Sequence, residues 1–242
     1  RRHREMAAKL GFDIKTQVAE PLFATVGDTG AAFAPMMLVA ALEEAKPGDR
    51  ILYADYSDGA DTYILRVTEQ IEKVKGRRGI KRHMASKAML PSYAQYLRLR
   101  DVMSWGEKPH ETGESSVSTT WRDRKWVLRG RGQKCRQCGY IQYPFQRMCI
   151  WCQAKDNFDE IRISDRKGTL YTFSMDGRAD VPVLPNVNAV VNLEGGGRFC
   201  SEMTDRDPEK VKVEMPVELT FRRIHEAGGF HNYFWKVRAI RC

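Results

Sequence analysis

The sequence has few cysteines and no long apolar run, and each shortage excludes a class of protein. All six cysteines follow residue 134, so residues 1–134 offer no thiol for covalent catalysis. The longest apolar run, Ala31 to Leu42, is far shorter than the roughly 20 residues that a membrane helix needs. No stretch resembles the charged and apolar regions of a secretory signal. These absences predict a soluble, cytoplasmic protein without a membrane segment.

The composition is that of a globular protein with an excess of positive charge. Hydrophobic residues make up 42% and charged residues 29% of the 242 positions, which excludes a disordered or fibrous chain. Forty Lys and Arg against 31 Asp and Glu give a formal net charge of +9. Residues 73–87 hold seven basic and no acidic residues, and residues 121–136 hold seven basic residues and one Asp. Each run indicates either solvated linker or surface charge, or a phosphate-binding segment.

Four of the cysteines form two Cys-x-x-Cys pairs with ten residues between the pairs: Cys135, Cys138, Cys149 and Cys152. Each pair can bind one metal ion through both thiolates, and two pairs complete a tetrahedral site. In a reducing compartment this pattern favours metal ligands, although two redox dithiols or unliganded thiols are the alternative. We therefore predict a zinc ribbon over residues 132–158 with a closed, structural Zn²⁺ site. Cys200 and Cys242 lack this spacing and are interpreted as ordinary buried or terminal cysteines.

The hydrophobic pattern divides the rest of the chain into regions of different period. Residues 1–72 alternate helix and strand signals, and their apolar helix over residues 31–42 needs more than about 70 residues to enclose it. Residues 73–131 predict a basic connector with an amphipathic helix and a polar linker over residues 106–120. Over residues 159–242 apolar residues recur with period two, which predicts a small antiparallel barrel of OB type.

Motifs in these regions resemble two families in a fixed order. "RRHREMAAKLGFD" and "VGDTGAAFAPMMLVAALEEAKPGDRILYADYSDGAD" resemble the C-terminal part of hydroxymethylglutaryl-CoA synthase-like condensing enzymes of the thiolase superfamily. "CRQCGYIQYPFQRMCIWCQ", "GTLYTFSM", "GGGRFCSEMTD" and "HNYFWK" resemble zinc-ribbon/OB-fold proteins associated with acyl-CoA. The two likenesses cover residues 1–72 and 91–242 and are typical of a fusion. They imply an α+β chain in which a partial thiolase-like α/β region precedes a rubredoxin-like zinc ribbon and a small antiparallel OB-type β-barrel.

The resemblance implies chemistry on acyl-CoA thioesters. We expect a component of an enzyme that makes or breaks a carbon-carbon bond next to a CoA thioester, with the zinc-ribbon/OB module shaping the acyl-CoA site and docking the partner. The family's Cys nucleophile and His lie upstream of the matched region, so the chain alone is not expected to catalyse condensation. A missing N-terminal half or a separate thiolase-fold subunit would supply them, in a homo- or hetero-oligomer. The acyl group and the direction of reaction stay open.

The resemblance also points to candidate site residues. Asp28 of "GDTGAA" occupies the position of an Asn that helps hold the thioester oxygen, and Gly59 of "SDGAD" lies in a turn whose amide can stabilise an oxyanion. The alternatives are that Asp28 caps the following helix and that Gly59 only permits a turn. Lys81, Arg82 and Lys87, in the first basic run, are candidates for binding the phosphates of coenzyme A.

A nucleic-acid-binding protein is the alternative from another class. An OB barrel beside a zinc ribbon, with a net charge of +9 and the aromatic stretch "HNYFW", could bind single strands by stacking and phosphate contacts. Against this alternative, Tyr233 and Trp235 share a strand face with Val237 and Ala239, a pattern that favours a core over a stacking platform. Nucleic acid would also leave the α/β region unexplained. It is the less favoured partner.

Overall fold

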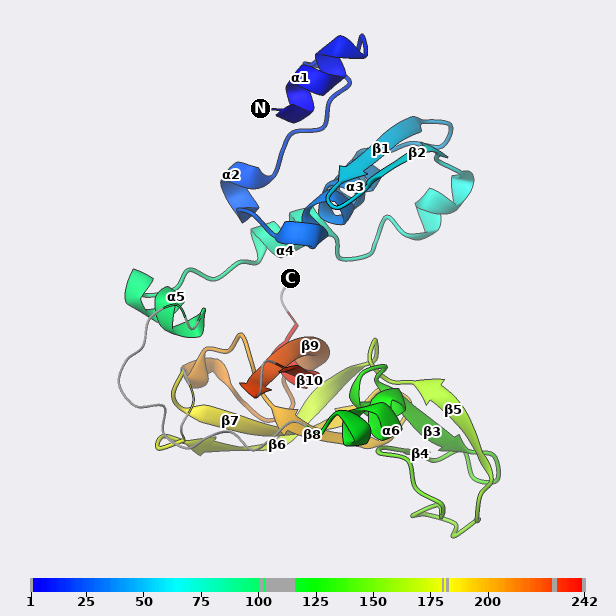
Figure 1. The fold of residues 1–242 in the computed structure, drawn as a ribbon. Coiled ribbons are helices and arrows are strands. Elements are labelled where there is room, and N and C mark those ends of the chain that lie inside the picture. Colours follow the sequence, from blue (N-terminus) through cyan, green and yellow to red (C-terminus); the bar gives the residue numbers. More distant parts are fainter. Residues whose placement is uncertain are drawn as a thin grey trace. The chain divides into compact units, whose positions relative to one another are not determined.

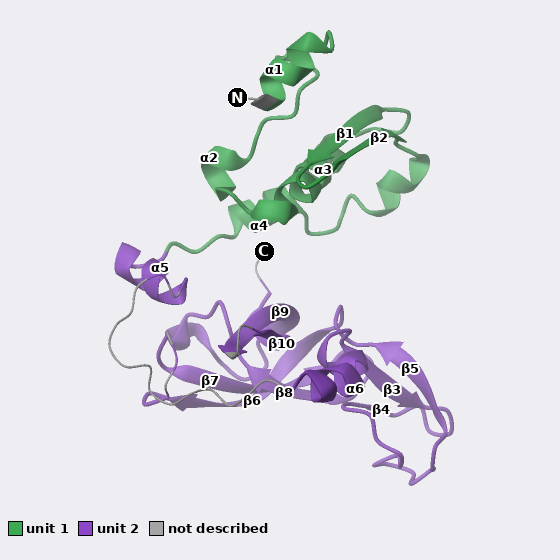
Figure 2. Cartoon of the chain, viewed as in Figure 1, with its two compact units in different colours: residues 1–89, 242 green, residues 90–241 purple. Residues whose placement is uncertain are grey.

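The protein is described from a computed structural model, whose ribbon is shown in Figure 1. The structure describes residues 2–100, 102, 116–179, 181, 183–227 and 230–240. The chain divides into two units, one ending at Met89 and the other beginning at Leu90 (Figure 2). Both units combine helices with antiparallel strands, which confirms the α+β class. Among the described helices, none has the length and apolar character needed to cross a bilayer.

The first unit is built around one helix and one β-hairpin. Helix α3 (Phe33–Glu44) follows a 3₁₀ turn at Gly30–Ala32 and packs against β1 (Arg50–Tyr56), which forms a hairpin with β2 (Ala60–Arg66). Pro35 lies in the first turn of α3, where a missing N–H removes no helical hydrogen bond. The apolar helix expected in this region is therefore present. The shorter helices are α1 (Arg2–Lys9), α2 (Phe23–Val26), η2 (Glu69–Lys73) and α4 (Ile80–Ala85).

This first unit has almost no core of its own. Among its described residues only Ala45 and Val67 are buried. No residue of α3 is buried, although the helix is apolar nearly all round, and Val39 is 41% exposed. Leu52 of β1 and Ile64 of β2 are partners in register and are 41% and 67% exposed. Apolar surface left open on both the helix and the hairpin agrees with the expectation that this unit cannot enclose its own helix.

The second unit contains a closed five-stranded barrel. Its strands are β6 (Lys167–Asp176), β7 (Asn186–Leu193), β8 (Arg198–Glu202), β9 (Pro216–Ala227) and β10 (Phe230–Ala239). They pair antiparallel in the order β10-β9-β6-β7-β8. A parallel bridge between Met203 and Val237 then joins the end of β8 to β10, and Thr204 N donates to Val237 O at 2.7 Å. This closure confirms the OB-type barrel.

Alternating apolar side chains fill the barrel, but not along its whole length. The buried positions of β7 are those that period two predicts: Val187, Ala189, Val191 and Leu193. Trp235 packs against this core, whereas Tyr233 is 39% exposed and stacks on Phe221 at 5.3 Å. The expectation of a core position for Tyr233 is therefore wrong. Since β8 meets β10 only near Val237, no described strand covers the far end of the β9–β10 hairpin.

A small sheet before the barrel forms the ribbon. It consists of β3 (Arg131–Cys135), β4 (Ile141–Gln142) and β5 (Phe158–Arg162), in the order β4-β3-β5. Because Arg131 pairs with Arg162, the ribbon extends slightly beyond the expected residues 132–158. Its β4 lies tightly against the turn between β7 and β8, where a side chain at Gly197 would approach Ile141 O to 2.8 Å.

The expected connector over residues 73–131 is divided between the two units. Its first part, up to Met89, belongs to the first unit, and α5 (Tyr93–Leu99) in the second unit corresponds to the expected amphipathic helix. Most of the polar linker lies outside the described residues. Its last residues form the start of α6 (Val117–Val127), because Ser116 accepts from Thr119 N and caps the helix. Trp126 of α6 packs edge-on against Tyr143 and Phe234, which fixes the helix to both ribbon and barrel.

Candidate functional site

The two turns of the ribbon bring four thiols together. Cys135 and Cys138 come from the end of β3, and Cys149 and Cys152 come from the loop between β4 and β5. Their four Sγ atoms all lie within 4.8 Å of one another. The distance is 3.6 Å from Cys135 to Cys152 and 3.5 Å from Cys138 to Cys149. Four sulfur atoms at about 2.3 Å from a tetrahedral Zn²⁺ would lie about 3.8 Å apart, so the cluster fits such an ion.

The same backbone turn follows each cysteine pair. Gly139 N donates to Cys135 O at 2.9 Å, and Gln153 N donates to Cys149 O at 3.0 Å. Both donors have a left-handed backbone, with φ of 76° at Gly139 and 61° at Gln153. Glycine adopts this conformation without steric cost, whereas glutamine does not. The second turn therefore needs more support from its surroundings than the first.

The surroundings of the thiols already favour the thiolate form at two positions. The amide of Cys138 lowers the pKa of Cys135 by more than burial raises it. Burial also raises the pKa of Cys149, but backbone amides of its own turn and the neighbouring thiols bring it down to about 7. At Cys138 the amide of Tyr140 lowers the pKa, yet burial and the other three thiols together raise it to about 12. Binding of a metal cation to all four thiolates would therefore release protons from this cluster.

Two buried glutamines support the second turn, and sequence reasoning missed them. Gln133 and Gln142 are direct partners on β3 and β4 and are only 3% and 4% exposed. Gln133 Nε2 donates to Gln146 O at 2.6 Å. Gln142 bonds to the main chain on both sides of Cys149. A glutamine in a short strand normally indicates an exposed position, so the sequence carries no signal for this role.

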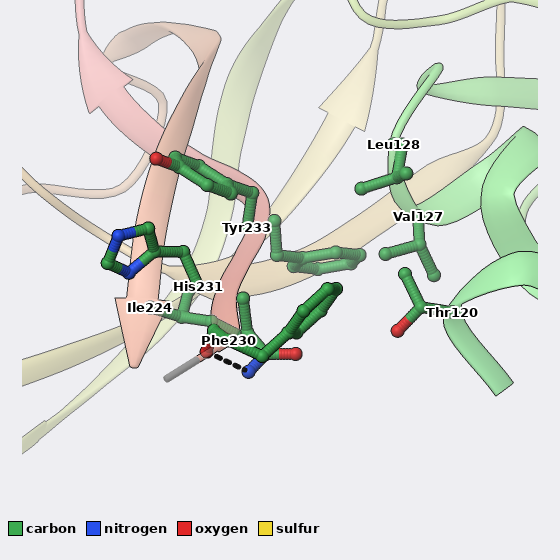
Figure 3. A pocket seen from close by; sticks show the side chains of 9 residues that line it. Thr120, Val127, Leu128, Ile224, Phe230, His231 and Tyr233 are labelled. Atoms are coloured by element: carbon green, nitrogen blue, oxygen red, sulfur yellow. Dashed lines mark hydrogen bonds between the residues drawn. The ribbon is translucent and has the colours of Figure 1, made fainter. Parts of the chain in front are cut away.

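An apolar pocket of about 290 Å³ lies between α6 and the end of the β9–β10 hairpin (Figure 3). Val127 and Leu128 form one wall, while Ile224 and Phe230 come from the hairpin. His231 lies on the hairpin side, where its Nδ1 is 2.8 Å from a carboxylate oxygen of Glu226. Because most of its lining is hydrocarbon, the pocket suits an apolar group.

Asp28 and Gly59 are exposed, and each makes a local hydrogen bond. Asp28 Oδ1 accepts from Gly30 N at 2.8 Å, at the start of the 3₁₀ turn that leads into α3. Gly59 O accepts from Ser57 N at 2.9 Å in the turn between β1 and β2. Neither contact decides between a role in the thioester site and a purely structural role. A chemical role for either residue stays a prediction.

Two of the three candidate phosphate ligands have partners within the first unit. Lys81 Nζ forms an ion pair with Glu44. Arg82 Nη1 donates to Gly76 O at 2.8 Å. Lys87 lies beyond α4 and is exposed. Of the three, Lys87 is therefore the best placed to meet an external phosphate.

Three of the seven basic residues in the second basic run form ion pairs with β5. Lys125 and Arg131 lie 2.8 Å and 3.8 Å from the carboxylate of Glu160. Arg136 lies 2.8 Å from Asp159. This pairing favours ordinary surface charge over phosphate binding for residues 121–136.

Sequence similarity connects this chain to a known family. A family model described as the C-terminal OB-fold domain of ChsH2 matches residues 160–222. A "DUF35 domain-containing scaffold protein" of Methanocaldococcus jannaschii is 35% identical over 132 residues, covering 52% of this chain and 93% of that protein. This chain belongs to the DUF35 family.

Further similarities concern condensing enzymes and aldolases. Hydroxymethylglutaryl-CoA synthase of Methanopyrus kandleri is 30% identical over 104 residues, which cover 42% of the DUF35 chain but only 30% of the synthase. The match to a solved structure titled "Ltp2-ChsH2(DUF35) aldolase" covers 54% of this chain and 98% of the solved chain, with 19% sequence identity and a TM-score of 0.39. These two sequence matches confirm the resemblance to both families that the motifs indicated. Neither match supports nucleic-acid binding.

Proposed function

We propose that this DUF35 chain is a component of a cytoplasmic, thiolase-superfamily assembly that makes or breaks a carbon-carbon bond next to a CoA thioester. The observation that carries the proposal is the open apolar surface of the first unit, where α3 has no buried residue and Leu52 and Ile64 face solvent. Such a surface needs a protein layer over it. Similarity to hydroxymethylglutaryl-CoA synthase supports a thiolase-like layer, from a longer polypeptide or a separate subunit.

In this assembly the chain would supply structure and part of the substrate site. Residues 1–134 contain no cysteine, and four of the later cysteines cluster in the ribbon. Cys200 lies on β8 of the barrel, where it is exposed and not buried as expected, and it is outside the region that resembles the condensing enzymes. The nucleophile would therefore come from the thiolase-like partner. Asp28 and Gly59 are proposed to contribute to the thioester site, and Lys87 to the phosphate site.

We further propose that Cys135, Cys138, Cys149 and Cys152 hold one Zn²⁺. Four soft donors fill a tetrahedral shell and leave no open position, so the ion would be structural. The ribbon contacts the barrel through Ile141 and Gly197, so the ion would help to keep the shape of the ribbon/OB module that is proposed to dock the partner.

The test is purification of the tagged chain from its native cells, followed by identification of what accompanies it. We expect a thiolase-fold protein in stoichiometric amount, together with CoA. Leu52→Lys combined with Ile64→Lys should abolish the association, because two charges would be buried in an apolar contact. Val213→Lys is the matched control, since Val213 is also exposed, at 51%, but lies in the barrel unit. Recovery of nucleic acid instead of a thiolase-fold protein would overturn the proposal.

A further inference from the structure

We infer that Gln142 is a positioning residue of the metal site, whose side-chain amide aims the Cys149 thiolate at the ion. The inference rests on the proposed Zn²⁺ site and adds a residue that is not itself a ligand. It makes Gln142 responsible for the geometry of the second cysteine pair, and thereby for part of the metal affinity.

The hydrogen bonds of Gln142 span the ligand. Its Oε1 accepts from Ile150 N at 3.1 Å, and its Nε2 donates to Met148 O at 3.0 Å. Met148 and Ile150 are the residues immediately before and after Cys149. One amide therefore fixes the main chain on both sides of a buried thiol, in the way that second-shell groups orient metal ligands.

Backbone contacts around Cys149 join the loop mainly to itself. Met148 forms a bridge with Lys155, and Cys149 N donates to Ala154 O at 2.9 Å. These bonds shape the turn but do not place it relative to the sheet. Gln142 belongs to β4, so its two bonds connect the turn to the sheet that carries the first cysteine pair. Gln133 of β3 adds a second link at Gln146, but only the bonds of Gln142 reach the residues that flank Cys149.

The position of Gln142 is itself set by the barrel. Its neighbour Ile141 is 3% exposed and lies against the β7–β8 turn. A Cβ at Gly197 would approach Ile141 O to 2.8 Å, and Gly197 has a left-handed φ of 86°. Gly197→Ala would therefore push β4, and with it Gln142, away from the barrel. We therefore expect this substitution to lower the metal affinity, although Gly197 does not contact any of the four cysteines.

The experiment measures the metal affinity of the full chain by competition with a chromophoric chelator for Zn²⁺, and by the absorption bands of bound Co²⁺. Gln142→Met keeps the length of the side chain but removes both hydrogen bonds. We expect a 10- to 100-fold loss of Zn²⁺ affinity, as is usual for second-shell changes, together with altered Co²⁺ bands. Gly197→Ala should shift both in the same direction.

Thr220→Val is the matched control. Thr220 is a buried polar residue of β9, 7% exposed, whose Oγ1 accepts from Arg222 at 2.6 Å. Its loss should lower the melting temperature without changing metal affinity or the Co²⁺ bands. If Gln142→Met stays within about threefold of the wild type, or if the control loses as much affinity, the inference is overturned.

A measurement on the wild type protects the test against a variant that does not fold. In the zinc-loaded chain the amide of Ile150 should exchange slowly with deuterium, because Gln142 holds it. Rapid exchange at Ile150 would also overturn the inference. Failure of the chain to bind any metal would instead sink the Zn²⁺ proposal itself, so the two failures are distinguishable.

Discussion

Removing the metal should unfold the ribbon while leaving most of the barrel in place. The perturbation is chelation of the purified chain, or Cys149→Ser. Apart from the ligand Cys135, the ribbon sheet buries one hydrophobic side chain, Ile141, among the described residues of β3, β4 and β5. Without a core of its own, the ribbon depends on the ion for its fold.

The size of the effect follows from the energy of metal binding. Structural Zn²⁺ sites with comparable ligands contribute about 10–16 kcal/mol at neutral pH, whereas a whole domain is stable by only about 5–15 kcal/mol. The free energy lost with the ion is therefore larger than the contacts of Ile141 can offset. The barrel has its own apolar cluster and should survive, except at the β7–β8 turn that lies against Ile141.

Hydrogen exchange followed by mass spectrometry measures the protection of the ribbon and of the barrel in one experiment. After chelation, peptides over residues 131–162 should lose their protection, and the turn at Gly197 should exchange faster. Peptides over Val187–Leu193 should stay protected, because that strand is buried in the barrel. Retained protection over residues 131–162 in protein verified to be free of metal would refute this reasoning. Substantially less than one zinc per chain in carefully prepared protein would refute the site.

Three further predictions concern single side chains. Burial raises the pKa of Glu202, but Lys236, with smaller contributions from Asn186 and Arg206, holds that pKa below its ordinary 4.5. The pair therefore stabilises the barrel above that value and loses its effect as the pH falls through the lower, folded pKa. Urea unfolding should show Glu202→Gln less stable than the wild type at pH 7 and equal to it in strong acid; a difference that persists in acid would contradict this. Lys87→Glu should weaken CoA binding by the assembly and flatten the salt dependence of that binding. If the affinity measured by calorimetry is unchanged, the first basic run is ordinary surface charge and not a phosphate site. Asp28→Asn can keep the hydrogen bond from Gly30 N but removes the carboxylate. If Asp28 acts as a general base, the rate of the assembly should therefore fall roughly 100-fold. An unchanged rate and pH profile would show that Asp28 is not part of the site.

The features that could be predicted from the sequence are those with a local pattern. Cys-x-x-Cys spacing determines which thiols meet, because each pair is closed by its own turn. Period two in "VNAVVNL" predicts the buried face of β7, since alternation alone decides which side chains point inward. The apolar run around α3 likewise indicates a helix that needs other protein around it.

The features that could not be predicted depend on contacts distant in sequence or on where an element ends. Gln142 is buried only because the loop that carries Met148 and Ile150 returns to it. Lys81 meets Glu44 across 37 positions of the sequence. Tyr233 has the right alternation for a core but lies past the point where β8 joins β10. In each case the deciding contact is with residues distant in sequence, so a pattern of neighbouring residues could not predict it.

The most direct test of the account is an assay of acyl-CoA carbon-carbon bond formation and cleavage on three samples: the chain alone, its thiolase-fold partner alone, and the two together. The chain alone should be inactive, because residues 1–134 provide no nucleophilic cysteine. The combination should be more active than the partner alone. Robust activity of the isolated chain, at the rate of the complete assembly, would contradict the account.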